Sequence, residues 1–192
     1  MQNIKKIILV IITLLLINIL QLFSKGDSEM QKQEVTMTLE HSGIPIKINE
    51  KFLLTVIFKN NTKSTFAFSH YFAKVEDSIH IYSGQNEEIH LSTRGIIDPK
   101  IIPTEEMFFQ LKPGKSKSFH LPFELTVKEN MHYLEHKNLW EHFIFPLDIK
   151  EIYFKAIFNS GKHSIELGEE ELGYNVYNET LESNKIKIRI DG

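Results

Sequence analysis

The sequence predicts an all-β protein, an antiparallel β-sandwich preceded by an N-terminal signal helix. Large apolar side chains recur at every second position in several segments after Asp27, and turn-forming residues separate these segments. Hydrophobic residues make up 42% and charged residues 24% of the 192 positions, with a formal net charge of -3. This composition is typical of a globular domain and excludes a disordered or collagen-like chain.

The first 26 residues have the pattern of an export signal. Lys5 and Lys6 precede an apolar run over residues 7–20, and no acidic residue occurs before Asp27. A short basic region followed by an apolar region is typical of a secretory signal peptide. The apolar stretch is also shorter than the roughly 20 residues that span a bilayer without strain. We therefore expect the protein to be exported, to the periplasm, the cell surface or the medium.

A candidate cleavage site sets the expected domain boundary. Ser24 and Gly26 lie at its -3 and -1 positions. Residues 1–26 are then the signal peptide, with an uncleaved N-terminal membrane anchor as the alternative, and residues 27–192 form a single β-sandwich domain. Cleavage removes three lysines and no acidic residue, which lowers the formal net charge from -3 to -6. The membrane is expected as a partner only through this N-terminal segment.

About nine segments have the period-two pattern of strands with one buried face. In residues 119–125 every odd position is large and apolar, and every even position is polar or proline. Residues 152–158 are also partly apolar on the second face, which favours a central strand. Pro122 cannot donate a ladder hydrogen bond, so we expect its strand to lie at an edge or to carry a bulge. The other segments are 35–39, 44–48, 52–58, 66–68, 79–81, 89–91 and 185–190.

Turn chemistry separates the predicted strands. Residues 60–63, 112–115 and 159–162 are rich in Asn, Pro, Gly and Ser and predict hairpins or corners between sheets. Two stretches do not fit a strand. Residues 94–106 contain two prolines, and residues 128–140 have a composition compatible with a helix. We expect both to be insertions on the sandwich, the second one helical or irregular.

Four segments follow one another in the order LLTVIFKNNT, FQLKPGKSKSFHLPFEL, EIYFKAIF and LESNKIKIRI. They contain an N-N/T turn, an L-x-P-G-x-S hairpin and a final isoleucine-rich strand. This order resembles that of exported bacterial immunoglobulin-like sandwiches, and the resemblance covers about half of the mature chain. It implies an immunoglobulin-like β-sandwich and leaves the task of that scaffold open.

Composition and motifs exclude several kinds of chemistry. Cysteine is absent, so there are no disulfides, thiolate nucleophiles or cysteine-bound metals. Lys and Arg number 22 against 25 Asp and Glu, with no basic run among aromatics, so a nucleic-acid partner is not expected. Neither a G-x-S-x-G elbow nor a glycine-rich phosphate loop occurs. We assign no catalytic, cofactor-binding or metal-ligating residue and expect no cofactor.

The sequence at residues 132–136, HYLEH, is the motif with the most specific chemical meaning. On a helix, His132 and His136 would share a face and bind zinc, and Glu135 would act as the general base of a hydrolase. The apolar residues that follow instead favour an amphipathic connector with solvated histidines. We therefore keep a zinc-dependent hydrolase only as an alternative function.

A second histidine pair follows from strand pairing. If Ile81 faces Ile89, both apolar sets lie on one side and His80 lies opposite His90 on the outer face. Two imidazoles could hold a divalent cation or repel each other below about pH 6.5. Two ligands do not make a tight site, so we interpret them as ordinary exposed histidines.

These observations predict a non-catalytic exported binding module. Its partner is an unknown protein or surface ligand, contacted through loops or along an exposed strand edge. Residues 94–106 are the preferred loop, because two prolines reduce the entropy lost when it is fixed against a partner. A structural subunit that assembles through strand edges is a further alternative. The sequence leaves open the partner, the oligomeric state and cleavage of the N-terminus.

Overall fold

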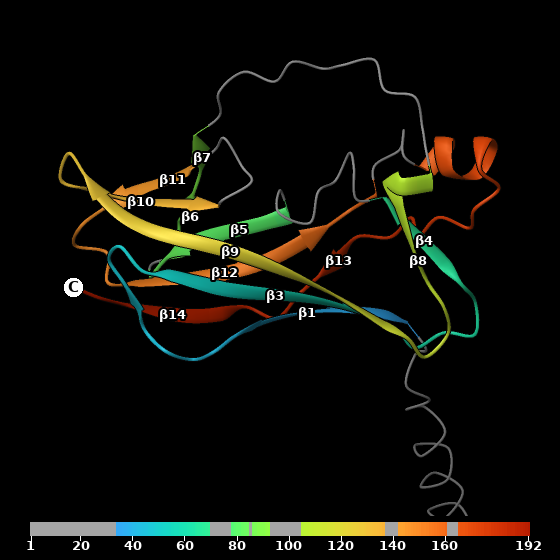
Figure 1. Ribbon diagram of the computed structural model, residues 1–192, viewed down its shortest axis with the longest axis horizontal. Coiled ribbons are helices and arrows are strands. Elements are labelled where there is room, and N and C mark those ends of the chain that lie inside the picture. The colour runs from blue at the N-terminus through green and yellow to red at the C-terminus, as the bar shows by residue number, and fades with distance from the viewer. Residues whose placement is uncertain (1–33, 70–77, 85, 93–104, 137–141, 161–164) are drawn as a thin grey trace, which may run out of the picture. The chain divides into compact units, whose positions relative to one another are not determined.

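The computed structural model of the chain describes residues 34–69, 78–84, 86–92, 105–136, 142–160 and 165–192 (Figure 1). Residues Glu34–Gly192 cluster into one compact unit. The predicted signal peptide and all of the preferred loop before its last two residues lie outside the described residues. Within the described part of the chain, no helix has the length and apolar character needed to cross a membrane.

The first of two large sheets has six antiparallel strands. Its longest strand, β9, lies between β3 and β10, and its edges are β1 and β7. In order across the sheet, the strands are β1 (Val35–His41), β3 (Lys51–Asn60), β9 (Ser116–Lys128), β10 (Met131–His136), β11 (His142–Pro146) and β7 (Leu91–Ser92).

The second large sheet is built around β12, which pairs with β14 and β5 and, at its end, with β13. Its edge strand β2 runs parallel to β14, and its other pairings are antiparallel. The strands are β2 (Ile46–Lys47), β14 (Ile186–Asp191), β12 (Glu151–Phe158), β5 (Ile79–Ser83), β6 (Glu88–Ile89) and β13 (Leu181–Glu182).

A smaller unit completes the fold. Strands β4 (Phe66–Ser69) and β8 (Phe108–Leu111) pair with each other. A single 3₁₀ turn, η3 (Glu105–Met107), precedes β8, and a single π-helical turn, η4 (Leu167–Glu171), packs nearby through Gly168 against Phe108. The prediction of a strand-rich, antiparallel protein is therefore confirmed.

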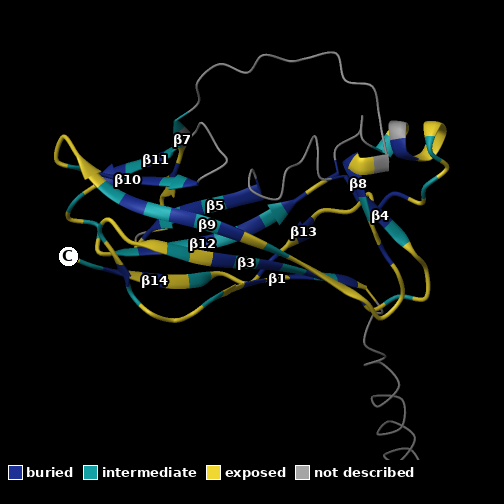
Figure 2. Ribbon diagram, in the orientation of Figure 1, coloured by how far each residue is buried: buried dark blue, intermediate teal, exposed yellow. Residues whose placement is uncertain are grey.

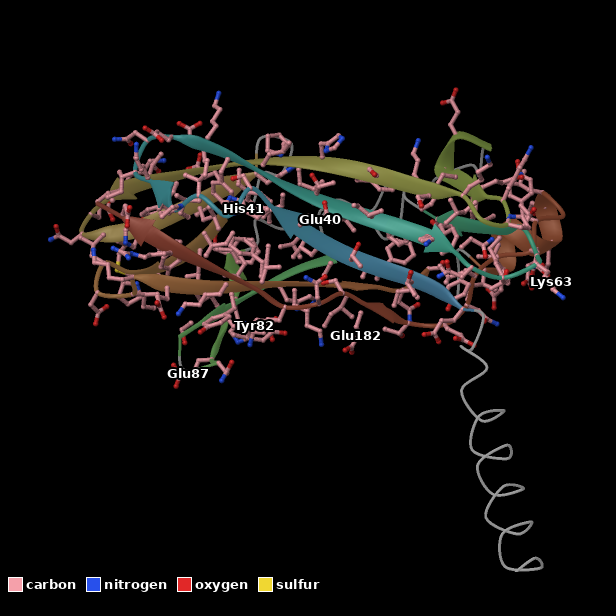
Figure 3. The ribbon with its side chains drawn as sticks, turned by 90° about the horizontal axis from the view of Figure 1, so that it is seen from below. Glu40, His41, Lys63, Tyr82, Glu87 and Glu182 are labelled. Atoms are coloured by element: carbon pink, nitrogen blue, oxygen red, sulfur yellow. The ribbon has the colours of Figure 1, made fainter. Side chains whose placement is uncertain are left out.

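Alternating side chains of the two large sheets form one core. In β12, Ile152, Phe154, Ala156 and Phe158 are all fully buried, while the residues between them are partly exposed. The ring of Phe154 lies 6.0 Å from the ring of Phe123 in β9. Figure 3 shows the two sheets edge-on, with β3 and β9 in one layer and β12 and β14 in the other. In Figure 2 buried positions alternate with partly or fully exposed ones along the strands, and most of the turns are exposed.

Phe58 of β3 is the point at which all three sheets meet. Its ring centroid lies 5.6 Å from that of Phe68 in β4 and 5.5 Å from that of Phe109 in β8. It also lies 5.8 Å from Phe119 in β9 and 5.2 Å from Phe158 in β12. Most of these contacts are edge-to-face, the geometry that aromatic rings prefer.

One side of the core is closed by the segment that follows β13. The side chain of Asn184 accepts a hydrogen bond from the Leu39 amide (2.8 Å) and donates one to the Leu39 carbonyl (3.0 Å). The Ser183 amide donates to the Ala156 carbonyl (2.9 Å), and the Ser183 hydroxyl accepts from the Ala156 amide (2.8 Å). Two consecutive residues therefore join β1 of the first sheet to β12 of the second.

The other side is closed where the chain changes sheets. Strand β6 belongs to the second sheet and β7 to the first, with only His90 between them. The edge strands β2, β6 and β7 each have two residues. Short edges are one way in which β proteins limit pairing with other chains.

The helix-compatible prediction for residues 128–140 is wrong over the described part of that stretch. Residues 131–136 form β10, which pairs with β9 on one side and β11 on the other. Glu129 and Asn130 both have positive φ angles, 51° and 59°. A two-residue turn with two positive φ angles matches the twist of an antiparallel hairpin and returns the chain alongside β9.

The expectation of an edge or a bulge at Pro122 is also corrected. Strand β9 is internal, and its pairing with β3 runs without a break from Glu124 to Ser116. On its other side, the pairing with β10 ends at Phe123, opposite His136. Pro122 lies one residue beyond that point, so within the described strands its missing N–H costs no ladder bond with β10.

The predicted turn at residues 60–63 is confirmed, and it is organised by a buried side chain. The Asn60 amide group donates to the carbonyls of Ser64 (2.7 Å) and Leu111 (2.8 Å). Its carbonyl oxygen accepts from the amide and the hydroxyl of Thr62. Asn60 therefore fixes the end of β3 against the end of β8 and leaves none of its own hydrogen-bonding groups unused.

We expect Phe58→Ala to lower the free energy of unfolding by about 3–5 kcal/mol, because it leaves a cavity where the three sheets meet. Leu53→Ala, in the same strand but 47% exposed, should cost less than about 0.5 kcal/mol. Urea denaturation followed by circular dichroism measures both. Equal losses in the two variants would contradict the central position of Phe58.

Candidate functional site

The structure does not bring the HYLEH residues together. His132 and His136 both lie on the buried face of β10 and are 0% and 2% exposed. Four residues along a strand place their Cα atoms about 13 Å apart, which is too far for both to bind one zinc ion at about 2 Å. Glu135 lies on the opposite face, where its carboxylate pairs with the Lys128 ammonium at 2.9 Å.

The predicted pair of exposed histidines, His80 and His90, is found only in part. Ile81 pairs with Ile89 as predicted, but residues 79–82 do not go on to pair with residues 91–92, which form β7 and pair with β11 in the first sheet. His80 instead has a carboxylate partner, and its Nδ1 lies 2.7 Å from Oε1 of Glu88. His90 lies just past the end of β6 and is exposed. Among the described residues, no three His, Asp or Glu side chains are grouped so that they could hold a metal ion.

A cleft of about 410 Å³ lies where two turns meet, one between β5 and β6 and the other between β11 and β12. This volume is within the range of sites that bind small ligands or single side chains. The lining combines acidic, basic and apolar groups. The lining residues are Ser83, Gly84, Glu87, Pro146, Asp148, Ile149, Lys150 and Glu151.

Local backbone bonds shape both walls of this cleft. In the first turn, the Ser83 amide donates to the Glu87 carbonyl (2.8 Å), and the Asn86 amide donates to the Ser83 carbonyl (2.9 Å). Asn86 has a φ of 66°, a left-handed conformation that asparagine tolerates better than most residues. In the second turn, the Ile149 amide donates to the Pro146 carbonyl at 3.2 Å.

Lys185 supports the first turn from the outer face of the second sheet. Its ammonium lies 4.4 Å from the ring centroid of Tyr82 and 5.0 Å from that of Tyr153, and it donates to Oδ1 of Asn86 at 2.7 Å. The two tyrosines are directly opposite each other in β5 and β12. Cation–π attraction therefore holds this lysine against the turn. Figure 3 shows Tyr82 and Glu87 at the same margin of the fold.

The cleft contains more negative than positive charge. Three of its lining residues are acidic and one, Lys150, is basic. Glu151 is paired with Lys187 at 2.7 Å. Glu87 and Asp148 are exposed and make no ion pair with any residue that the structure describes. Two carboxylates at this cleft are thus available to a basic ligand.

Ser83 is the buried polar residue of the lining. It is 7% exposed, it lies on the buried face of β5, and its hydroxyl has no hydrogen-bond partner among the described residues. Ser183 is equally buried, but its hydroxyl both accepts from the Ala156 amide and donates to the Asn184 carbonyl.

A buried histidine, His132, lies beside the strand that leads into the turn between β11 and β12. Burial lowers the pKa of the His132 imidazole below its ordinary value of 6.5, and the charge of Lys150, a lining residue, lowers it further. The backbone of Leu147 acts weakly in the opposite direction. Neither ring nitrogen makes a hydrogen bond of standard geometry within the described part of the chain.

No protein-family model matches the chain, and searches of the curated proteins and of the solved structures also find no match.

We expect Ser83→Ala to leave the free energy of unfolding unchanged or to raise it by up to about 1 kcal/mol, because it removes a buried hydroxyl that has no partner. Ser183→Ala should lower it by about 1–3 kcal/mol, since the Ala156 amide then loses its acceptor. Urea denaturation compares the two serines at equal exposure. A similar loss in both variants would mean that Ser83 has a partner.

Proposed function

We propose that this protein is an exported immunoglobulin-like β-sandwich that binds a partner without catalysis, and that the cleft between the β5–β6 and β11–β12 turns is its binding site. Two sheets share one core, their strands are antiparallel apart from the β2–β14 pair, and the chain changes sheets at His90; these features support the sandwich class. The turns at the ends of such sheets are where these scaffolds carry binding residues.

The single observation that carries the binding site is the pair of unpaired carboxylates, Glu87 and Asp148, at a cleft whose lining also includes the apolar residues Pro146 and Ile149. A lysine or arginine side chain has a cationic head for the carboxylates and an apolar stem for Pro146 and Ile149. The ligand class we propose is therefore a basic side chain presented by a protein or peptide. The acidic balance of the mature chain would also steer a basic partner toward it.

The two alternative functions find less support in the geometry. A zinc hydrolase needs His132, Glu135 and His136 around one metal, and these side chains lie on opposite faces of a strand. Assembly through strand edges needs a long free edge. In the two large sheets the described edge strands are two residues long, apart from β1, whose Leu39 backbone is bonded to Asn184. The loop at 94–106 stays a prediction, because residues 94–104 lie outside the described residues.

Binding is tested with Nα-acetyl-arginine methylamide as the probe and chemical-shift changes of backbone amides as the readout. We expect shifts at Gly84, Glu87 and Ile149 that weaken as salt is added. Glu87→Gln and Asp148→Asn should each weaken binding about two- to fivefold, the range for exposed ion pairs. Glu40→Gln, an exposed acid on β1, is the matched control and should leave binding unchanged.

Nα-acetyl-glutamine methylamide and acetate are the uncharged and anionic comparison probes. If either of them shifts the cleft amides more than the arginine probe does, the basic ligand class is wrong. If none of the three probes shifts them, the cleft is not the binding site.

A further inference from the structure

His132 is a titratable group enclosed in an otherwise apolar part of the core. It is 0% exposed, and its ring lies 5.0 Å from that of Phe145, its direct neighbour in β11. Its direct neighbour on the other side, in β9, is Val127. Neither neighbour offers a negative charge or a hydrogen-bond acceptor on its side chain. No described residue offers a protonated imidazole at this position a counter-ion, and a buried cation without one is strongly unfavourable.

The described charged groups around this ring do not compensate for a proton. In the turn between β11 and β12, the positive charge of Lys150 lowers the pKa of the ring, the backbone of Leu147 acts weakly in the opposite direction, and Asp148 is exposed. On the same face of β10, the other titratable group is His136, and Glu135 lies on the opposite face with Lys128. Protonation of His132 would therefore add repulsion from Lys150 to the cost of burial.

We propose that His132 makes the turn between β11 and β12 acid-sensitive and thereby couples the shape of the cleft to pH. Pro146, Asp148, Ile149 and Lys150 of this turn are half of the cleft lining. A protonated His132 ring has a lower free energy in water than in the core. Moving this turn outward would expose the ring to water and separate it from Lys150. This inference does not depend on which ligand the cleft binds.

The direction of the effect follows from linkage. The pKa of His132 is lowered in the folded state, so an open state with its ring in water binds a proton more readily. The closed turn therefore has its full stability above about pH 6.5 and loses stability as the pH falls from 6.5 toward the lowered value. Between pH 7.5 and 5.5 the opening equilibrium should rise by up to about tenfold if the closed state stays unprotonated.

Hydrogen exchange of the purified full chain, read by mass spectrometry, tests this inference. Protection factors for peptides covering residues 143–149 should fall by up to about tenfold from pH 7.5 to 5.5 after correction for intrinsic exchange rates. In His132→Phe this fall should disappear. His120→Phe, which replaces an exposed histidine on the outer face of β9, is the matched control and should retain it.

A second variant keeps the test decisive if His132→Phe does not fold. Lys150 is exposed, so Lys150→Gln should fold normally, raise the pKa of His132 and reduce the pH dependence of exchange at residues 143–149. Lys47→Gln is its control on β2. A fall in protection that persists unchanged in His132→Phe, or a His132 pKa at or above 6.5 by NMR titration, would overturn the inference.

Discussion

The fold depends on the contact of Phe58 with four other phenylalanine rings, because this contact is shared by all three sheets. Hydrogen bonds along the strands hold each sheet together but do not hold one sheet against another. The rings from β4, β8, β9 and β12 that lie within 6 Å of the Phe58 centroid pack the sheets together, and the hydrogen bonds of Ser183 and Asn184 add a polar link between the two large sheets. A chain without cysteine has no covalent alternative to this packing. The two turns that line the cleft therefore connect strands whose positions depend on this aromatic core.

Two side-chain amides hydrogen-bond to backbone groups that the strand ladders leave unpaired. The side chain of Asn60 bonds to groups at the ends of β3 and β8, and the side chain of Asn184 bonds to both the amide and the carbonyl of Leu39. Asn60 is fully buried, and a buried polar group that is fully satisfied specifies one arrangement of the chain, because alternatives leave it unpaired. Asn60 begins an N-x-T sequence, and its burial assigns that motif to structure rather than to modification.

The strands could be predicted from sequence because burying one face of a strand forces alternation, as residues 119–125 and 152–158 show. The helix-compatible prediction for residues 131–136 is wrong because Leu, Glu, His and Met are all tolerated in helices. The hairpin turn that precedes β10 also gives no clear signal, because it contains Glu and Asn in place of a glycine-containing pair. The cleft could not be predicted. Its walls come from turns about 60 residues apart in sequence, and only the packing of the sheets brings Glu87 and Asp148 to one place.

The link between Asn184 and β1 depends on an intact side-chain amide, because the same group donates one hydrogen bond and accepts another. Deamidation of this side chain would replace its NH₂ group by a carboxylate oxygen, which would then face the Leu39 carbonyl that the amide now donates to. Two acceptors would oppose each other, and the outward peptide of the seven-residue β1 would lose its cover. A change of one functional group at residue 184 would thus weaken the link between β1 and the segment that follows β13.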